Sequence, residues 1–379
     1  MSDEYEHLGI YSDLVSAAPA MRPEPPLARP GKATVKRILE VMNFSIGEEM
    51  PQEPRLERRW AKDGLQGEEI SWWVGYGPRT HAWLLKPAGT TGRLPGIVAL
   101  HDHGAFKFYG KEKIAAGPEE MPDIIKVHQH EYYGDRPYAN ALAREGCVVL
   151  VADAFLWSSR RIPLETIPEE TRQMAATHRQ WSFQTMYPQG KEVDYNAAAM
   201  LGEDVIEKYC ALLGTTFAGV VSYEDRVMAN YLASRPEVDP QRIGCIGLSG
   251  GGCRSAMLGA TSDRIKARVV VGMMSTYAGL LDRNVVSHTW MFFPTGWPRY
   301  GDWTDMAAAR APSPLLVQYN LQDELFSEAG MRAADKRLAE HYRSVDAPLN
   351  YRGEFYPGKH KFDLEMQAVA FQWLRERLV

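Results

Sequence analysis

Short apolar runs alternate with longer segments of helical periodicity along most of the chain after residue 94. The apolar runs have the length of buried strands and fall at 96–100, 147–152, 243–248, 267–271, 314–319 and 349–355. The segments of helical periodicity fall at 138–145, 223–234, 253–260, 328–342 and 362–378. Strands that alternate with helices are typical of a sheet covered by helices on both faces. The pattern therefore predicts an α/β fold with a mostly parallel central sheet.

The chain before residue 94 follows a different pattern. Residues 1–60 contain a proline-rich piece and an amphipathic segment at 33–42, so we expect an N-terminal helical extension that packs on the main body or on a second subunit. Two apolar and aromatic runs at 68–74 and 81–86 are separated by a Gly-Tyr-Gly-Pro turn, which predicts a hairpin. We place the main domain at 61–379 and expect any homo-oligomer to form through the extension.

Three long segments interrupt the alternation, at 107–131, 155–216 and 276–305. Each follows the carboxyl end of a predicted strand, the edge at which open α/β sheets bind their ligands. Their aromatic content argues against disorder, so we expect them to form a cap that lines a pocket. The candidates for the walls of this pocket are Trp157, Trp181 and Trp290. The alternative is that these indoles fill the core beneath the cap, because tryptophan is highly buried on average.

Composition narrows the class of protein without identifying a function. The 379 residues are 45% hydrophobic and 24% charged, which is typical of a globular protein with a sizeable core. A net charge of −5 gives no basic excess that would suggest a nucleic acid or an anionic membrane as partner. The sequence has no leader-like N-terminus and no apolar run of 18 residues, so we expect a cytoplasmic protein. The four cysteines lack the spacing of a zinc site.

The stretch from Arg242 to Ala260 predicts a strand, a sharp turn and a helix. Ser249 occupies the turn, between Gly247 and Gly251, in the pattern G-x-S-x-G. Such a turn imposes strained backbone angles on the serine and leaves no room for side chains at the flanking glycines. It also presents the hydroxyl beside free N–H groups at a helix N-terminus. Ser249 is therefore the candidate nucleophile.

A serine hydroxyl needs a base to accept its proton and a third group to orient that base. Asp323 follows the next-to-last predicted strand, and His360 follows the last one. The order Ser249, Asp323, His360 is the order that the nucleophile-elbow architecture uses. Taken singly, Asp323 is also a good turn residue and His360 a solvated loop histidine. The neighbouring Glu324 is the alternative acid.

The loop after the first parallel strand, Leu100-His-Asp-His-Gly-Ala-Phe106, is expected to complete an oxyanion hole. One N–H would come from Gly250, directly after the nucleophile, and the second from His103 or Gly104. The sequence leaves these two open. A rival interpretation is a metal cluster made of His101, Asp102, His103, His128 and His130. We do not favour it, since a metal site needs ligands that converge from defined spacings and the triad already supplies a mechanism.

The elbow, the acid and histidine loops and the His-Asp-His-Gly loop together resemble the α/β-hydrolase superfamily. The chain is similar to its dienelactone-hydrolase-like and acetyl-xylan-esterase-like members over residues 67–379. This resemblance implies a serine hydrolase that cleaves a small-molecule carboxylic ester or lactone through an acyl-enzyme, without a cofactor or metal. The same fold also supports thioesterases, peptidases and C–C bond hydrolases, which remain the alternatives.

Two departures separate the chain from particular activities of that superfamily. Dienelactone hydrolases carry a cysteine nucleophile where this chain has Ser249. Glucuronoyl esterases place an arginine directly after the serine, where this chain has Gly250. The resemblance therefore extends to the fold and the triad, and it leaves the substrate open.

Overall fold

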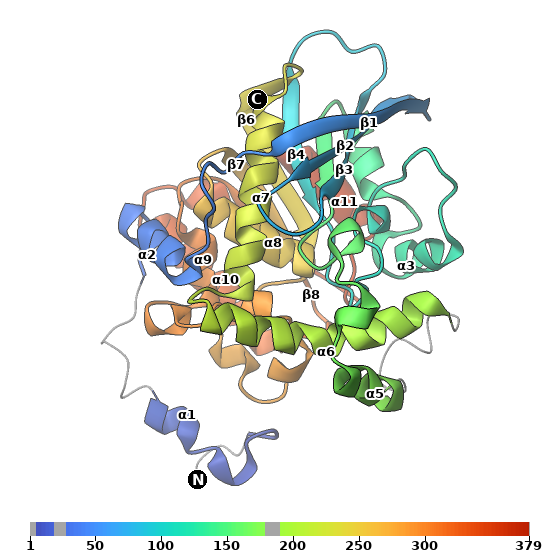
Figure 1. The fold of residues 1–379 in the computed structure, drawn as a ribbon. Coiled ribbons are helices and arrows are strands. Elements are labelled where there is room, and N and C mark those ends of the chain that lie inside the picture. Colours follow the sequence, from blue (N-terminus) through green and yellow to red (C-terminus); the bar gives the residue numbers. More distant parts are fainter. Residues whose placement is uncertain (1–4, 19–27, 179–189, 379) are drawn as a thin grey trace.

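The computed structural model describes residues 5–18, 28–178 and 190–378 (Figure 1). Within them a nine-stranded sheet has the order β1-β2-β3-β5-β4-β6-β7-β8-β9. The pairs β1–β2, β2–β3 and β3–β5 are antiparallel, and all further pairs are parallel. The strands are β1 (Gln52–Lys62), β2 (Leu65–Trp73), β3 (Thr80–Pro87), β4 (Leu94–Leu100), β5 (Val148–Ala152), β6 (Val238–Leu248), β7 (Ile265–Val271), β8 (Leu315–Asn320) and β9 (Tyr351–Tyr356). The predicted mostly parallel sheet is confirmed.

Helices cover both faces of the sheet. They are α1 (Leu14–Ala17), α2 (Lys32–Met42), α3 (Asp123–Tyr133), α4 (Tyr138–Arg144), α5 (Glu169–His178), α6 (Lys191–Leu212), α7 (Phe217–Ser234), α8 (Gly250–Thr261), α9 (Trp303–Ala308), α10 (Glu328–Arg343) and α11 (Leu364–Arg377). Side chains that alternate along β4 separate the two layers: Val98 and Leu100 pack with α7, while Ile97 and Ala99 pack with α4 and α11. Helices α2, α8, α9 and α10 lie on the α7 side.

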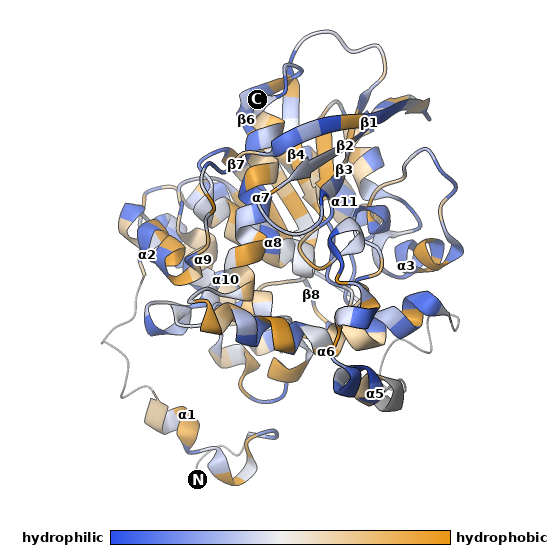
Figure 2. Cartoon of the chain, in the orientation of Figure 1, coloured by the Kyte–Doolittle hydropathy of each residue, from blue (hydrophilic) through white to orange (hydrophobic). Residues whose placement is uncertain are grey.

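The N-terminal segment differs from the prediction in one respect. Helix α2 forms where a helix was expected and buries Ile38 and Met42 against the main body. However, the last part of the predicted helical extension 1–60 is the edge strand β1, which pairs with β2. Almost every residue of β1 is exposed, and its sequence is dominated by charged residues (Figure 2). The strand was missed because its stability comes from backbone pairing, which leaves no hydrophobic period in the sequence.

The three predicted insertions lie around the carboxyl end of the parallel strands. The first leads into α3, the second contains α5 and α6, and the third consists of short 3₁₀ turns that end at α9. Helix α6 crosses beneath the end of the sheet (Figure 1). Trp181, one of the predicted wall residues, lies outside the described residues.

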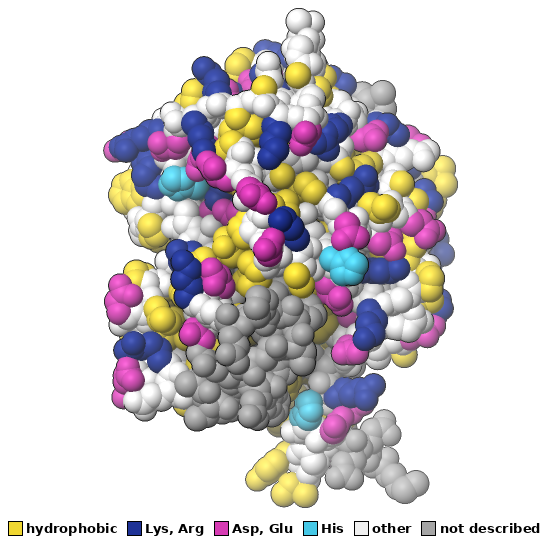
Figure 3. Space-filling view, turned by 90° about the vertical axis from the view of Figure 1, so that its right-hand side faces the viewer, with side chains coloured by type: hydrophobic (Ala, Val, Ile, Leu, Met, Phe, Trp, Pro, Cys, Tyr) yellow, Lys and Arg dark blue, Asp and Glu magenta, His cyan; other side chains and the backbone are white. Residues whose placement is uncertain are grey.

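The apolarity of the helices and the distribution of surface charge bear on contact with a membrane or a nucleic acid. Among the described residues, no individual helix has the length and apolarity needed to cross a membrane, although α6 and α7 taken together, at 88° to each other, meet that criterion by length and composition. On the face drawn in Figure 3, Lys and Arg side chains are interspersed with Asp and Glu.

Candidate active site

Ser249 lies in the turn between β6 and α8. Its backbone angles are φ 58° and ψ −124°, a conformation that residues with a side chain seldom adopt. Two hydrogen bonds hold it there: the Ser249 N–H donates to Val271 O at 2.9 Å, and the Cys253 N–H donates to Ser249 O at 2.8 Å. The strained turn therefore fixes Ser249 at the carboxyl end of β6, where its side chain is half-buried.

The glycines beside Ser249 have the role that the sequence pattern predicts. A Cβ atom at Gly247 would collide with the backbone of Gly251. A Cβ atom at Gly251 would collide with the carbonyl oxygen of Leu100, at the end of β4. Helix α8 therefore begins in contact with two strands at once, and any side chain at either position would displace the turn.

His360 and Asp323 are brought together from the loops after β9 and β8. The Nδ1–H of His360 donates to Asp323 Oδ2 at 2.5 Å, and the Leu325 N–H donates to Asp323 Oδ1 at 2.9 Å. Nε2 of His360 is buried and has no hydrogen-bond partner among the described residues. Burial opposes the charged imidazolium, but the Asp323 carboxylate holds the pKa of His360 above its ordinary value. With Nδ1 protonated, Nε2 carries the lone pair of a base.

The alternative acid, Glu324, is placed differently. Its side chain is exposed, whereas that of Asp323 is 1% exposed and bonded to His360. Glu324 accepts a hydrogen bond through its backbone: the Asn284 side chain donates to the Glu324 carbonyl oxygen at 3.1 Å. The geometry thus assigns the bond with the imidazole to Asp323.

The imidazole of His360 lies next to the point at which the Ser249 turn is anchored. A Cβ atom at Gly272 would lie 3.0 Å from His360 Cε1 and 3.1 Å from its Nδ1. Gly272 directly follows Val271, whose carbonyl accepts the Ser249 N–H. The histidine loop and the elbow therefore meet at the end of β7, as the shared strand edge predicts.

The loop after β4 packs directly on the residue that follows Ser249. A Cβ atom at Gly250 would lie 2.6 Å from the backbone nitrogen of His103 and 2.7 Å from its Cβ. Gly104 points elsewhere: it has φ 57°, and a Cβ atom there would collide with the Asp102 carboxylate. Of the two loop residues that the sequence left open, His103 is the one whose N–H lies beside Gly250.

The polar residues of the rival metal cluster are bonded to protein groups instead. Tyr133 OH donates to Asp102 Oδ1 at 2.6 Å, and His128 Nε2 lies 3.2 Å from the same oxygen. His130 is exposed on α3 and pairs with Asp135 at 2.8 Å. Within the described part of the chain, no group of three or more His, Cys, Asp or Glu side chains is placed to hold a metal ion.

The two described tryptophans of the predicted pocket have different surroundings. Trp157 is 1% exposed, belongs to a hydrophobic core cluster and donates its Nε1–H to His103 O at 3.4 Å. This position fits the core-filling alternative. Trp290 is 38% exposed and donates its Nε1–H to Asp204 on α6 at 2.6 Å. Its exposure fits the wall interpretation.

Two charged residues at the site, Lys107 and Glu203, were not predicted from the sequence. Both are buried, and they form an ion pair across 96 residues of sequence. Burial disfavours the charged form of Glu203 and would raise its pKa. The Lys107 ammonium and His103 nevertheless hold the pKa of Glu203 below its ordinary value. No local pattern marks such a pair, since its members are 96 residues apart in sequence and charged residues are mostly exposed.

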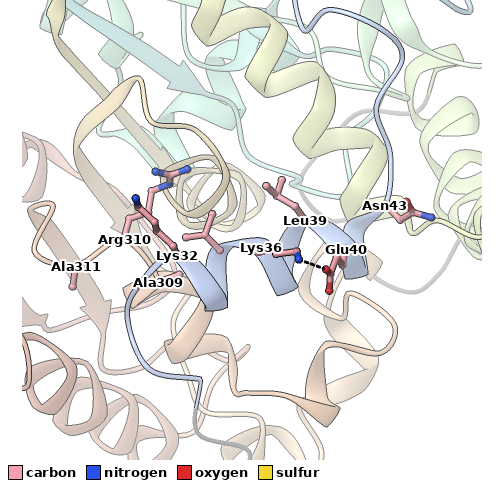
Figure 4. A pocket seen from close by; sticks show the side chains of 10 residues that line it. Lys32, Lys36, Leu39, Glu40, Asn43, Ala309, Arg310 and Ala311 are labelled. Carbon is pink, nitrogen blue, oxygen red and sulfur yellow. Dashed lines mark ion pairs between the residues drawn. The ribbon is translucent and has the colours of Figure 1, made fainter.

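A separate groove of about 630 Å³ lies between α2 and the segment Ala309–Ala311 (Figure 4). Lys32, Lys36 and Arg310 line it, and Lys36 pairs with Glu40 at 3.8 Å. None of the predicted site residues lines this groove, so it does not belong to the candidate active site.

Comparisons with known proteins agree with this architecture. No protein-family model matches the chain. It is 24% identical over 272 residues to a Bacillus subtilis protein named "Putative hydrolase YtaP", covering 72% of this chain and 74% of that protein.

Solved structures extend the likeness over nearly the whole chain. A Bacteroides fragilis protein described as a "putative acetyl xylan esterase" superposes with a TM-score of 0.63 at 17% identity, covering 92% of this chain and 82% of that one. A glucuronoyl esterase from Solibacter usitatus superposes with a TM-score of 0.59 at 12% identity, covering 95% and 100%. Together with the strand order and the elbow after β6, these likenesses show that the chain has the α/β-hydrolase fold.

Proposed function

We propose that the chain is a serine hydrolase that cleaves a small-molecule carboxylic ester or lactone, with Ser249 as nucleophile, His360 as base and Asp323 as the residue that orients the base. The observation that carries the proposal is the state of His360. Its Nδ1 is bonded to a buried carboxylate, its Nε2 has no hydrogen-bond partner among the described residues, and its ring lies beside Gly272, directly after the residue to which Ser249 is anchored. That arrangement is the one a base needs to accept the proton of a serine hydroxyl.

The reaction follows from these positions. Ser249 Oγ attacks the acyl carbon while its proton passes to His360 Nε2, and the carbonyl oxygen becomes an oxyanion. The N–H groups of Gly250 and His103 stabilise this oxyanion. The imidazolium then protonates the leaving alcohol oxygen, which leaves an ester of Ser249. Water attacks that ester with His360 again accepting a proton, and Ser249 departs with the proton restored.

The arrangement around Gly250 bears on the substrate. In glucuronoyl esterases an arginine follows the nucleophile, but a side chain at position 250 would lie 2.6 Å from the backbone nitrogen of His103. This loop and a larger residue at position 250 exclude each other. We therefore propose an ester substrate other than a glucuronoyl ester, with the short acyl groups of acetyl esters as the first to test.

The test combines a substrate panel with a covalent probe. The panel contains p-nitrophenyl esters of increasing acyl length, an acetylated xylo-oligosaccharide, a methyl glucuronate ester, a thioester and a 1,3-diketone. We expect ester turnover, and we expect a fluorophosphonate to label Ser249, identified by peptide mass spectrometry. In Ser249→Ala the rate should fall by about 10⁴ to 10⁶ with the melting temperature unchanged.

Two results would count against the proposal. Turnover by Ser249→Ala at more than a few per cent of the wild-type rate would exclude Ser249 as nucleophile. Cleavage of the diketone without ester turnover would favour a C–C bond hydrolase on the same triad.

A further inference from the structure

Glu203, on cap helix α6, is bonded to two other segments of the chain at once. Its Oε2 accepts hydrogen bonds from His103 Nε2 at 2.9 Å and from Lys107 Nζ. Its Oε1 accepts from Thr289 Oγ1 at 2.6 Å and from the Trp290 N–H at 3.1 Å. The first pair belongs to the loop and insertion after β4, and the second to the insertion after β7. One buried carboxylate therefore joins all three cap-forming insertions.

The His103 ring is fixed at both nitrogens. The Ala105 N–H donates to His103 Nδ1 at 3.0 Å, so Nδ1 must be the acceptor. The ring proton is consequently on Nε2, which donates it to Glu203. A ring that is held at two points also fixes the backbone to which it is attached, since rotation about either side-chain torsion would break one of the bonds.

The backbone of His103 is the part of the loop that meets the nucleophile turn. Its nitrogen lies where a Cβ atom at Gly250 would come within 2.6 Å. Its carbonyl accepts from Lys113 Nζ at 3.1 Å and from Trp157 Nε1 at 3.4 Å, which leaves the N–H side turned toward the elbow without an acceptor among the described residues. The position of this N–H therefore depends on the ring that Glu203 holds.

We propose that Glu203 is a positioning residue that couples the cap to the oxyanion hole. It places the His103 N–H only while α6 and the segment at Thr289 and Trp290 are seated against each other. The inference rests on the proposed function, because it assigns a role within that oxyanion hole. It extends that function by making transition-state stabilisation depend on a residue of the cap rather than of the sheet.

The first test separates the effects on kcat and KM. Glu203→Ala should lower kcat about 10²-fold, near the loss that follows removal of an oxyanion donor, and leave KM close to wild type. Glu203→Gln keeps an oxygen for His103 Nε2–H and should recover most of kcat. The matched control is Asp204→Ala, on the next residue of α6, which removes the acceptor of the Trp290 indole but has no contact with His103. Its kcat should stay near wild type.

In Glu203→Ala the buried ammonium of Lys107 loses its partner, which can prevent folding. A second variant avoids this outcome. Glu203→Leu combined with Lys107→Met removes both charges and keeps the volume similar. Circular dichroism and thermal melting establish that it is folded. It should show the same loss of kcat as Glu203→Ala, because His103 Nε2–H has lost its acceptor in both.

A double-mutant cycle tests whether Glu203 acts through His103. His103→Ala keeps the backbone N–H but removes the ring, so adding Glu203→Ala to it should cost little more. Additive losses would indicate an independent structural role and overturn the proposal. Wild-type kcat in Glu203→Ala or in the double variant would overturn it as well, as would a Glu203→Gln variant no better than Glu203→Ala.

The Ser249→Ala variant distinguishes this failure from failure of the proposed function. If Ser249→Ala is inactive and the Glu203 variants are unaffected, the hydrolase mechanism stands and the coupling is wrong. If Ser249→Ala remains active, both proposals are wrong.

Discussion

Replacing Gly250 by alanine is the most direct perturbation of the proposed oxyanion hole. The added Cβ would lie 2.6 Å from His103 N, 2.7 Å from His103 Cβ and 3.0 Å from His103 Cα. The ordinary contact distance between such atoms is about 3.5 to 4.0 Å, so the loop must move by about 1 Å or the helix must shift. The atoms that obstruct the methyl group are mostly backbone, which cannot move aside by changing a rotamer.

The loop is held on its other side, so this movement meets resistance. Lys113 Nζ donates to His103 O at 3.1 Å and to Asp102 Oδ2 at 3.1 Å, in a buried position. Overpacking of this kind costs about 1 to 3 kcal/mol of unfolding free energy. A displacement of about 1 Å at a reacting centre costs on the order of 10² in rate. We therefore expect Gly250→Ala to lower kcat about 10²-fold together with a measurable loss of stability.

The assay is steady-state hydrolysis of the best ester of the panel, with thermal melting on the same preparations. Gly202→Ala is the matched control, since a Cβ atom at Gly202 on α6 has nothing within 4 Å. It should retain kcat and melt at or above the wild-type temperature, because alanine is favoured over glycine within a helix. If Gly250→Ala melts early but keeps the wild-type kcat, the loop N–H does not serve the transition state. If neither quantity changes, the described packing of the loop is wrong.

Three further outcomes are expected. Asp323→Asn should lower kcat about 10⁴-fold and Glu324→Gln far less, because only Asp323 sets the tautomer of His360; equal losses would contradict this choice of acid. The rate should fall as pH drops through the raised pKa of His360, and this limb should move to lower pH in Asp323→Asn, which removes the group that raises that pKa. A pH profile that does not move would exclude His360 as the titrating base. Trp157→Ala should cost about 3 to 5 kcal/mol of stability with an unchanged substrate ranking. Trp290→Ala should instead shift relative rates among acyl sizes by about 1 to 3 kcal/mol with little change in melting, and the reverse pattern would exchange their roles.

The raised pKa of His360 also makes the stability of the fold depend on pH. Burial lowers the pKa of folded His360, but the charge and hydrogen bond of Asp323, together with the charge of Asp102, outweigh it, so the folded-state pKa is raised above that of the unfolded chain. Protonated His360 therefore contributes to stability below the unfolded pKa, and this contribution is lost as pH rises through the folded value. The window lies above pH 6.5, the ordinary value.

The elements that could be predicted from the sequence are those determined by local pattern and strand order. The turn at Ser249 could be predicted because the glycines that it requires, Gly247 and Gly251, lie within the same five residues of sequence. The bond between Asp323 and His360 followed from a topological rule, since residues that follow adjacent parallel strands meet at one edge. Strand β6 begins at Val238 rather than at residue 243, because Val238 and Asp239 pair with β4 across a register shift that no hydrophobic period marks.

What could not be predicted depends on contacts between distant segments. The choice between His103 and Gly104 is made by how the loop packs on α8 and around Asp102. Glu203 has an ordinary acidic side chain on a helix, and a sequence pattern would place it in solvent. Only its contacts with Lys107 and with the segment at Thr289, 86 residues away, show that it is interior.

The first insertion illustrates how such contacts specify a shape. It contains three lysines within seven residues, and all three are buried. Each pairs with a carboxylate of a different segment: Lys107 with Glu203, Lys111 with Asp153 and Lys113 with Asp102. Buried ion pairs add little net stability, since desolvation offsets their attraction, but breaking one is costly because a charge is left unpaired. Apolar side chains would hold the insertion in several similar positions, whereas three pairs with separate partners are satisfied together in only one. Lys111→Met, which leaves the buried Asp153 carboxylate without this cation, should therefore lower both the melting temperature and kcat.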